Sequence, residues 1–254
     1  MRNILTISRR EVSAYFNSPI AYIFMILFIF ILSFLFFVFF PFFTQSNPDL
    51  RHFFVWFPWV LSIFIPAVTM RLWSEERRSG TIELLMTWPL QAWEIVIGKY
   101  LAGLFVIAVS LALTFFVPLT LSSVISDGVG GSGIEWGVIF TSYLGALLIS
   151  SVYVALGSWA STLTSNQIVS LLVAISLSFV MAGIGSPPVV KFLNDLLGGI
   201  GNIRIGNLIG WFGTDSHFRE FSKGLINPVG LIYGFSLTVF FLVLNNLFVE
   251  GRKF

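Results

Sequence analysis

Six long apolar segments constrain this chain more than any other feature of its sequence. They cover residues 20–40, 53–68, 101–122, 138–158, 168–184 and 229–248. A bilayer core of ~30 Å is spanned by about 20 apolar residues in a helix. The second and fifth segments are short, and we expect them to extend into their flanks. The sequence therefore predicts an all-α polytopic membrane protein with six transmembrane helices, built as a single transmembrane domain over residues 1–254.

The overall composition agrees with a membrane protein. The chain is 56% hydrophobic and 10% charged, whereas about a quarter of the residues of a soluble domain are charged. Its net charge of +2 comes from Lys and Arg beside the apolar segments, so no nucleic-acid partner is expected. The absence of cysteine excludes disulfides, thiolate metal sites and cysteine nucleophiles. The first apolar run is too long for a cleavable signal peptide.

The distribution of Lys and Arg predicts the orientation, because cytoplasmic connections carry an excess of these residues. One side has nine of them: Arg2, Arg9, Arg10, Arg71, Arg77, Arg78, Lys99, Arg252 and Lys253. The other side has five: Arg51, Lys191, Arg204, Arg219 and Lys223. We therefore expect both termini and the segment 71–99 to lie in the cytoplasm, with the chain in the cytoplasmic (inner) membrane of a bacterium.

Signals for catalysis are missing from the sequence. No Asp, Glu, Lys, Arg or His falls within the six apolar cores, although ion-coupled carriers usually place such residues near the midplane. His52 and His217 are far apart in sequence, whereas a metal site needs clustered ligands. There is no phosphate-binding loop of the G-x-x-x-x-G-K-[ST] type. We expect no catalytic residue, metal or cofactor in this chain, and any energy for transport must come from a separate ATPase.

The N-terminal residues 2–17 have an amphipathic pattern. Ile4, Leu5, Val12, Tyr15 and Phe16 share one helical face. A basic amphipathic helix before a span is expected to lie in the membrane interface. A solvated N-terminal tail is the alternative.

The segment 71–99 is the only long charged stretch between two apolar segments. Its pattern predicts two short helices: Gly80 ends the first, and Thr81 caps a second over residues 82–86. Pro89 is then expected to start the helix that leads into the third span. Judged by charge alone, this segment is a solvated loop rather than a binding surface.

The outer loop 185–228 is expected to contain two helices. Pro187 and Pro188 end the fifth span, and residues 189–197 suit a helix in the outer interface. His217, Phe218 and Phe221 belong to a second helix, and residues 201–213 between them are glycine-rich and expected to be irregular. This loop is either an outer gate over an exit path or a cover on the helix bundle.

Several short motifs resemble those of the permease subunits of ABC-2 type transporters. They are Pro66-Ala67-Val68-Thr69-Met70, Glu75-Glu76-Arg77, Gly80-Thr81, Glu83-Leu84-Leu85, Pro89 and Gly98-Lys99. The segment 217–226 is similar to its counterpart in the gliding-motility-type branch, and the nitrous-oxide-reductase maturation permeases are close relatives. Asn227-Pro228 departs from that branch, where a more acidic stretch is expected.

The resemblance implies a permease that works as a homo- or heterodimer with two cytoplasmic ATP-binding subunits, which hold the ATP and Mg²⁺. It also implies that a coupling helix between spans 2 and 3 docks on the ATPase, and this reverses the preference for a solvated loop. The implied coupling residues are Glu75, Glu76, Arg77, Arg78, Gly80, Thr81, Glu83, Leu84, Leu85, Pro89 and Lys99.

The expected function is export of an amphipathic, lipidic or polymeric cargo. The alternative is a membrane anchor or assembly factor that transmits ATPase work to a partner on the outer side without moving cargo. The long outer loop 185–228 supports the alternative and would suit an outer accessory protein.

Overall fold

Helices make up almost all of the structure. The computed structural model describes residues 2–40, 50–82, 90–126, 135–197, 199–200 and 203–251. Its elements are α1 (Arg2–Phe16), α2 (Pro19–Phe39), α3 (Arg51–Phe54), α4 (Phe57–Thr69), α5 (Arg71–Arg78), α7 (Ala92–Thr114), α8 (Phe116–Ser126), α9 (Trp136–Leu163), α10 (Gln167–Ile184), α11 (Pro187–Leu197), β1 (Gly199–Ile200), β2 (Ile203–Arg204), α12 (Ile205–Trp211), α13 (Thr214–Phe221) and α14 (Pro228–Glu250).

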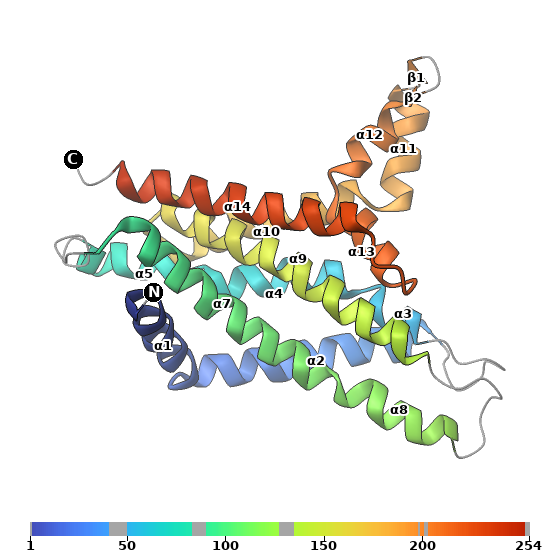
Figure 1. Cartoon of the computed structure of the whole chain (residues 1–254), viewed down its shortest axis with the longest axis horizontal. Helices are drawn as coiled ribbons and strands as arrows, with labels where there is room; N and C mark the ends of the chain where they lie inside the picture. Colours follow the sequence, from blue (N-terminus) through green and yellow to red (C-terminus); the bar gives the residue numbers. More distant parts are fainter. Residues whose placement is uncertain are drawn as a thin grey trace.

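Six helical stretches are long and apolar enough to cross a membrane, which confirms the predicted number. They are Ala21–Phe39, Arg51–Arg78, Ala92–Ser123, Trp136–Leu163, Gln167–Ile184 and Pro228–Glu250. These stretches run roughly alongside one another (Figure 1). The second is longer than the predicted span, because α3, α4 and α5 follow one another with only short breaks.

The third stretch has an interruption that the sequence explains. Helix α7 ends at Thr114 and α8 starts at Phe116. Pro118 lies one turn after Thr114, where it lacks the N–H that would bond to the Thr114 carbonyl, and its ring crowds that carbonyl. The backbone N–H of Phe115 bonds instead to the Ala112 carbonyl oxygen at 3.2 Å, a tighter turn.

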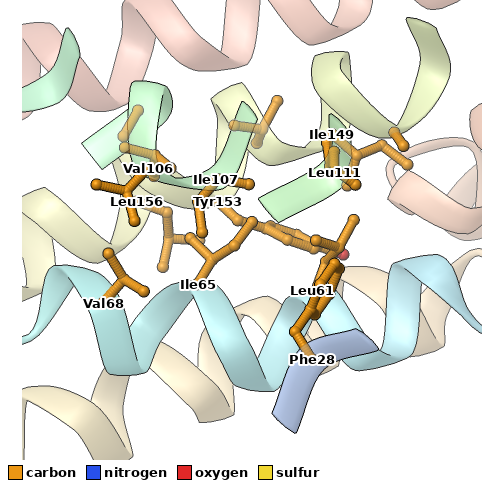
Figure 2. Packing of buried hydrophobic residues seen from close by; sticks show 14 of the residues in the cluster. Phe28, Leu61, Ile65, Val68, Val106, Ile107, Leu111, Ile149, Tyr153 and Leu156 are labelled. Atoms are coloured by element: carbon orange, nitrogen blue, oxygen red, sulfur yellow. The ribbon is translucent and has the colours of Figure 1, made fainter. Parts of the chain in front are cut away.

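Helix α9 occupies the centre of the bundle. Seven consecutive residues, from Val152 to Ser158, are all buried, so neighbours cover this helix on every side. Small residues allow close approach between membrane helices, and Gly157 does so here. A Cβ added at Gly157 would lie 2.1 Å from Oγ1 of Thr69 on α4. Figure 2 shows Tyr153 and Leu156 of α9 among apolar side chains of α4 and α7.

The outside of the bundle is also apolar. Ile26 and Phe30 on α2, Phe140 on α9 and Phe235 on α14 are all more than 60% exposed. A helix that is hydrophobic all round is typical of a core or membrane helix. Faces of this size suit contact with lipid, since soluble proteins rarely expose large apolar patches.

The two ends of the bundle carry different additional helices (Figure 1). At one end, called the α1–α5 end here, α1 packs against α7 and lies near α5. At the other, called the α11–α13 end, α11 and α12 form a hairpin that projects sideways. Strands β1 and β2 join its helices as a short antiparallel pair in which Gly199 is opposite Arg204.

The structure of the hairpin differs from one prediction made from the sequence. Residues 201–213 were expected to be irregular, but Ile205–Trp211 form α12. The glycines serve close packing instead of disorder: a Cβ added at Gly206 would lie 2.6 Å from the Val190 carbonyl oxygen on α11. The fifth span ends at Ile184, as the paired prolines predict. Helix α11 begins at Pro187, two residues before the predicted start at residue 189.

Candidate functional site at the α1–α5 end

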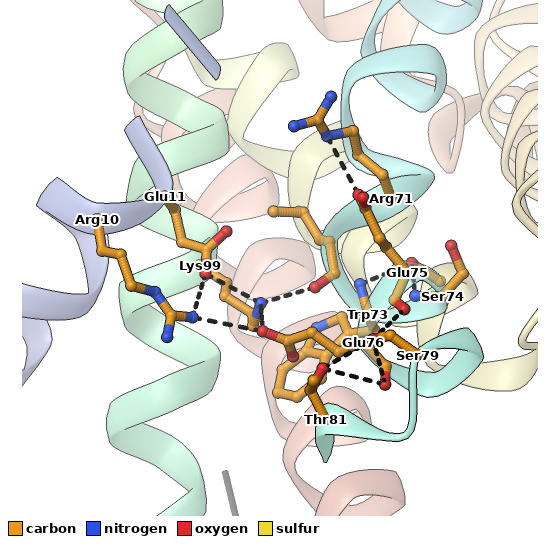
Figure 3. A network of polar contacts seen from close by, with 12 residues as sticks. Arg10, Glu11, Arg71, Trp73, Ser74, Glu75, Glu76, Ser79, Thr81 and Lys99 are labelled. Atoms are coloured by element: carbon orange, nitrogen blue, oxygen red, sulfur yellow. Dashed lines mark hydrogen bonds and ion pairs between the residues drawn. The ribbon is translucent and has the colours of Figure 1, made fainter. Parts of the chain in front are cut away.

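A buried lysine joins three helices at the α1–α5 end. The side chain of Lys99, in α7, is 1% exposed. Its Nζ lies 2.8 Å from Oε1 of Glu76 in α5 and 3.2 Å from Oε1 of Glu11 in α1. It also donates a 2.7 Å hydrogen bond to the Leu72 carbonyl oxygen. Figure 3 shows these contacts converging on the ammonium group. Every proton of the ammonium group therefore has an acceptor, which a buried lysine requires.

Arg10 closes this network from the surface. One guanidinium nitrogen lies 2.7 Å from Glu11 and 3.4 Å from Glu76. Burial raises the pKa of the Glu11 carboxyl, but Lys99 and Arg10 together outweigh burial and hold that pKa below its ordinary value. The Glu11 carboxylate in turn raises the pKa of Arg10. The network thus consists of two carboxylates shared between two basic side chains.

One face of α5 is fixed to α9 by hydroxyl groups. The first backbone N–H groups of a helix have no partner within the helix. Ser161 of α9 supplies one, since its Oγ accepts 3.1 Å bonds from the N–H groups of Trp73 and Ser74. The same hydroxyl donates to the Met70 carbonyl oxygen at 2.8 Å. A neighbouring helix therefore caps α5 and sets its position.

The buried Trp73 side chain adds to this junction. Its indole N–H donates to Oγ of Ser158 at 3.2 Å, and Nδ2 of Asn245 donates to the same oxygen at 2.8 Å. The ammonium of Lys99 lies 5.1 Å from the centroid of the Trp73 ring. Trp73 thus connects α5 to α9 and α14 on one side and to the buried charge on the other.

Helix α1 lies directly on the first turns of α7. A Cβ added at Gly98 would lie 2.8 Å from Cγ2 of Ile7, so only glycine permits this approach. Nδ2 of Asn3 donates to both carboxylate oxygens of Glu94 at 3.2 Å. Glu94 also accepts a 3.3 Å bond from the Gln91 N–H, which fixes the start of α7. The helix consequently starts at Ala92, three residues later than Pro89, where it was expected.

The tip of α5 is exposed. Glu75, Arg78, Ser79, Gly80 and Thr81 face outward. Gly80 has φ +73°, a conformation that ends helices and that glycine adopts without strain. The hydroxyls of Ser79 and Thr81 lie 2.9 Å apart. We call these five residues the α5 tip.

The structure divides the predicted coupling residues into three groups. In the first, Lys99 is buried and Glu76 is largely buried. The second is Arg77, which donates a 2.7 Å hydrogen bond to the Thr162 carbonyl oxygen. The third belongs to the α5 tip and consists of Glu75, Arg78, Gly80 and Thr81. Glu83, Leu84, Leu85 and Pro89 lie outside the described residues. Sequence reasoning missed Arg10, Glu11 and Ser161. The unpaired Lys99 at the start of an apolar run was the available signal, because a buried lysine needs an acidic partner.

The predicted gate residues lie at the α11–α13 end in two settings. Pro187 and Pro188 are exposed at the start of α11, whereas Phe218 and Phe221 are 1% exposed and pack against the bundle. His217 is buried, with its ring 4.0 Å from that of Tyr233. Pro187 and His217 line one cavity of about 600 Å³, and His217, Phe218 and Phe221 line a much smaller one of about 10 Å³.

No metal-binding cluster of three or more His, Asp or Glu side chains occurs in the part of the chain that the structure describes.

Comparison with known proteins agrees with this architecture. A family model described as ABC-2 family transporter protein matches residues 44–244, which include the second to fifth long helical stretches and the α5 tip. No curated protein matches the chain. The matched range covers more than half of the chain, so this multi-pass membrane protein belongs to the ABC-2 family of transporter proteins.

Proposed function

We propose that this chain is the permease subunit of an ABC exporter and forms the translocation path as a homo- or heterodimer. Separate cytoplasmic subunits bind ATP and Mg²⁺ and drive the cycle, and the cargo is amphipathic, lipidic or polymeric. We assign the chain to the gliding-motility-type or nitrous-oxide-reductase-maturation-type branch on the similarity of the segment 217–226. The observation that carries the proposal is the exposed α5 tip, which is rigidly joined to buried helices within a chain of the ABC-2 family.

The α5 tip has the chemistry of a docking surface. Glu75 and Arg78 present opposite charges one turn apart, and the side chain of Glu75 is 58% exposed. Complementary charges at an interface select the partner and its orientation more than they add affinity. The residues that follow, including Glu83, Leu84 and Leu85, are proposed to complete the surface.

Through the buried network, a displacement of the α5 tip would be transmitted to the packed helices. Glu76 ties α5 to α7 through Lys99 and to α1 through Arg10, while Ser161 ties it to α9. Separating buried charges is costly, because each is left without its partner. We therefore expect α1, α5 and α7 to move together when an ATPase pushes on the tip.

The proposed orientation puts the α1–α5 end in the cytoplasm. Arg9, Arg10, Arg71, Arg77 and Arg78 all belong to α1 or α5, and an excess of arginine marks the cytoplasmic side. The start of α1 and the end of α14 lie toward this end in Figure 1. The protein is accordingly assigned to the cytoplasmic membrane of a bacterium, with both termini inside.

The second candidate is a membrane anchor or assembly factor that transmits ATPase work to a partner outside. The observation that favours it is the α11–α12 hairpin, which projects from the bundle and whose helix α11 has no buried residue. The outer partner would be an accessory protein that binds the hairpin directly. A partner captured through the hairpin, together with no cargo, would select this candidate.

The test is capture of the ATPase by the tagged chain from membranes dissolved in a mild detergent. Wild type is compared with Arg78→Glu and Glu83→Lys, and the matched control is Lys191→Glu, an exposed charge reversal on α11. We expect a P-loop ATPase with wild type and the control, and about tenfold less with the other two, since rim charges govern association. Capture with every variant would refute the docking surface alone; no ATPase with wild type would refute the permease assignment.

A further inference from the structure

A cavity of about 180 Å³ lies near the α1–α5 end, lined by residues of α1, α2, α4, α5, α7 and α10. Neither Lys99 nor Glu76 lines it, and it adjoins the cavity at the Lys99 network, with which it shares Tyr15, Arg71 and Glu75. Its lining has a polar part, formed by Tyr15, Arg71, Glu75 and Gln167. The rest of the lining is almost entirely apolar, so the cavity is amphipathic.

The apolar part extends into the bundle. Its lining on α2 runs from Ala21 to Phe28, which at a rise of ~1.5 Å per residue covers about 10 Å of helix. Leu61 of α4 and Ile107 of α7 lie opposite, and Figure 2 shows Phe28, Leu61 and Ile107 at this junction. An apolar cavity of about 150 Å³ is large enough for a benzene molecule. The space therefore accommodates a short stretch of hydrocarbon chain.

The polar part presents an arginine with unused hydrogen-bonding capacity. Nε of Arg71 lies 3.7 Å from Oε2 of Glu75, too far for a hydrogen bond. The guanidinium carbon lies 4.9 Å from the centroid of the Tyr15 ring. Within the described residues, the two terminal nitrogens of Arg71 make no hydrogen bond, and Figure 3 shows them pointing away from Glu75. They are placed to bind a phosphate with two parallel hydrogen bonds.

Glu75 restricts the charge of a ligand that binds here. Its carboxylate lies beside the guanidinium and its side chain is 58% exposed, so it accepts a donor from outside the protein. A ligand that is purely anionic would be repelled by Glu75 while Arg71 attracts it. A zwitterionic headgroup satisfies both side chains, with its phosphate on Arg71 and its amine on Glu75.

We propose that this cavity binds one phospholipid whose headgroup carries a primary ammonium group. Arg71 holds the phosphate, Glu75 accepts hydrogen bonds from the ammonium, and the first part of one acyl chain enters between Phe28, Leu61 and Ile107. The lipid is a resident of the single chain and joins α1, α2, α4 and α7. Glu75 also belongs to the α5 tip, so the lipid lies beside the proposed ATPase-docking surface. The assignment does not rest on the cargo or on dimer formation.

The test uses native mass spectrometry of the full-length chain in detergent. The chain is titrated separately with phosphatidylethanolamine, phosphatidylcholine and phosphatidylglycerol that share the same acyl chains. We expect one tightly bound phosphatidylethanolamine per chain. Arg71→Gln should weaken all three lipids about tenfold, since a charge-assisted bidentate contact is lost. Glu75→Gln should remove the preference for phosphatidylethanolamine over phosphatidylcholine.

Two further variants make the test decisive. Ala67→Phe fills the apolar part of the cavity and should abolish binding, whereas the control Arg78→Gln changes an exposed arginine nearby and should not. Size-exclusion profiles check folding, and Arg71→Gln decides the matter if Ala67→Phe misfolds. Unchanged phosphatidylethanolamine binding in Arg71→Gln would overturn the site, and equal binding of the three lipids to wild type would overturn the ammonium assignment.

Discussion

The two ends of the bundle differ in how additional helices are attached to the membrane-spanning helices. At the α1–α5 end, α1 is joined to α5 and α7 by a buried network of charges centred on Lys99. At the α11–α13 end, α11 has no buried residue, and the hairpin contacts α10 and α13.

This difference predicts which end of the bundle is rigid and which end tolerates movement. A network of buried charges resists separation, because opening it leaves charges without partners. A hairpin with few buried apolar contacts opens locally at a small cost in free energy. The α1–α5 end is therefore expected to be rigid, and the hairpin is expected to be the more mobile of the two.

The largest expected effect is that of Lys99→Met. This change removes the buried one of the two basic side chains that Glu11 and Glu76 share and leaves only the half-exposed Arg10, so the free energy of unfolding should fall by about 3–5 kcal/mol. The matched change Lys191→Met, on the exposed face of α11, should alter it by less than about 0.5 kcal/mol. Thermal unfolding in detergent measures both. Equal shifts would show that the two ends do not differ in this way.

A second expectation is that lowering the pH changes the contributions of the two ends to folding stability in opposite directions. Burial, opposed by Arg219, raises the pKa of Asp215 in α13 from 3.8 to about 6. The folded state therefore binds this proton more tightly, and stability falls as the pH rises from about 4 to about 6, by roughly 3 kcal/mol. Glu11 has a lowered pKa, so its contribution is lost only as the pH falls through that lowered value.

The pH dependence of unfolding separates these contributions. Asp215→Asn should remove the decline between about pH 4 and pH 6, and Glu11→Gln should leave that decline in place. The same slope in wild type and Asp215→Asn would disprove the role of Asp215. The measurement requires only unfolding temperatures in detergent over a series of buffers.

The smallest expected effects come from two glycines that allow close packing. Gly98→Ala places a Cβ 2.8 Å from Ile7, so α1 is pushed from α7 and stability should fall by about 1–3 kcal/mol. Gly206→Ala clashes more closely, 2.6 Å from the Val190 carbonyl oxygen, yet its effect should remain within the hairpin. Hydrogen exchange is expected to rise across α1 in the first variant and only in α11 and α12 in the second.

Much of the fold could be predicted from the sequence. Apolar length alone gave six membrane-crossing segments, and the structure has six such stretches. Local chemistry also predicted the end of α5 near Gly80 and the end of the fifth span before Pro187. The break at Phe115 was missed, although Pro118 was its visible signal. Helix α12 was missed because glycines that permit close packing look like those of an irregular loop.

The candidate site was accessible from sequence only in part. The charges of residues 75–78 marked α5 as distinctive, but they did not distinguish the exposed Glu75 and Arg78 from the largely buried Glu76. Nor did they connect Lys99 with Glu11, which is 88 residues away. Helical periodicity places residues on a face, and it carries no information on which face meets which across the bundle.

The sequence by itself determined the solvent of this protein and the number of its spans, because a bilayer requires long runs of apolar residues and internal backbone hydrogen bonds. Only the tertiary structure decided the partners of its charges. Whether a given Glu in this chain is a solvated surface group or part of a buried ionic junction depends on the distance to cations on other helices, and that distance is set by how α1, α5, α7 and α9 pack together.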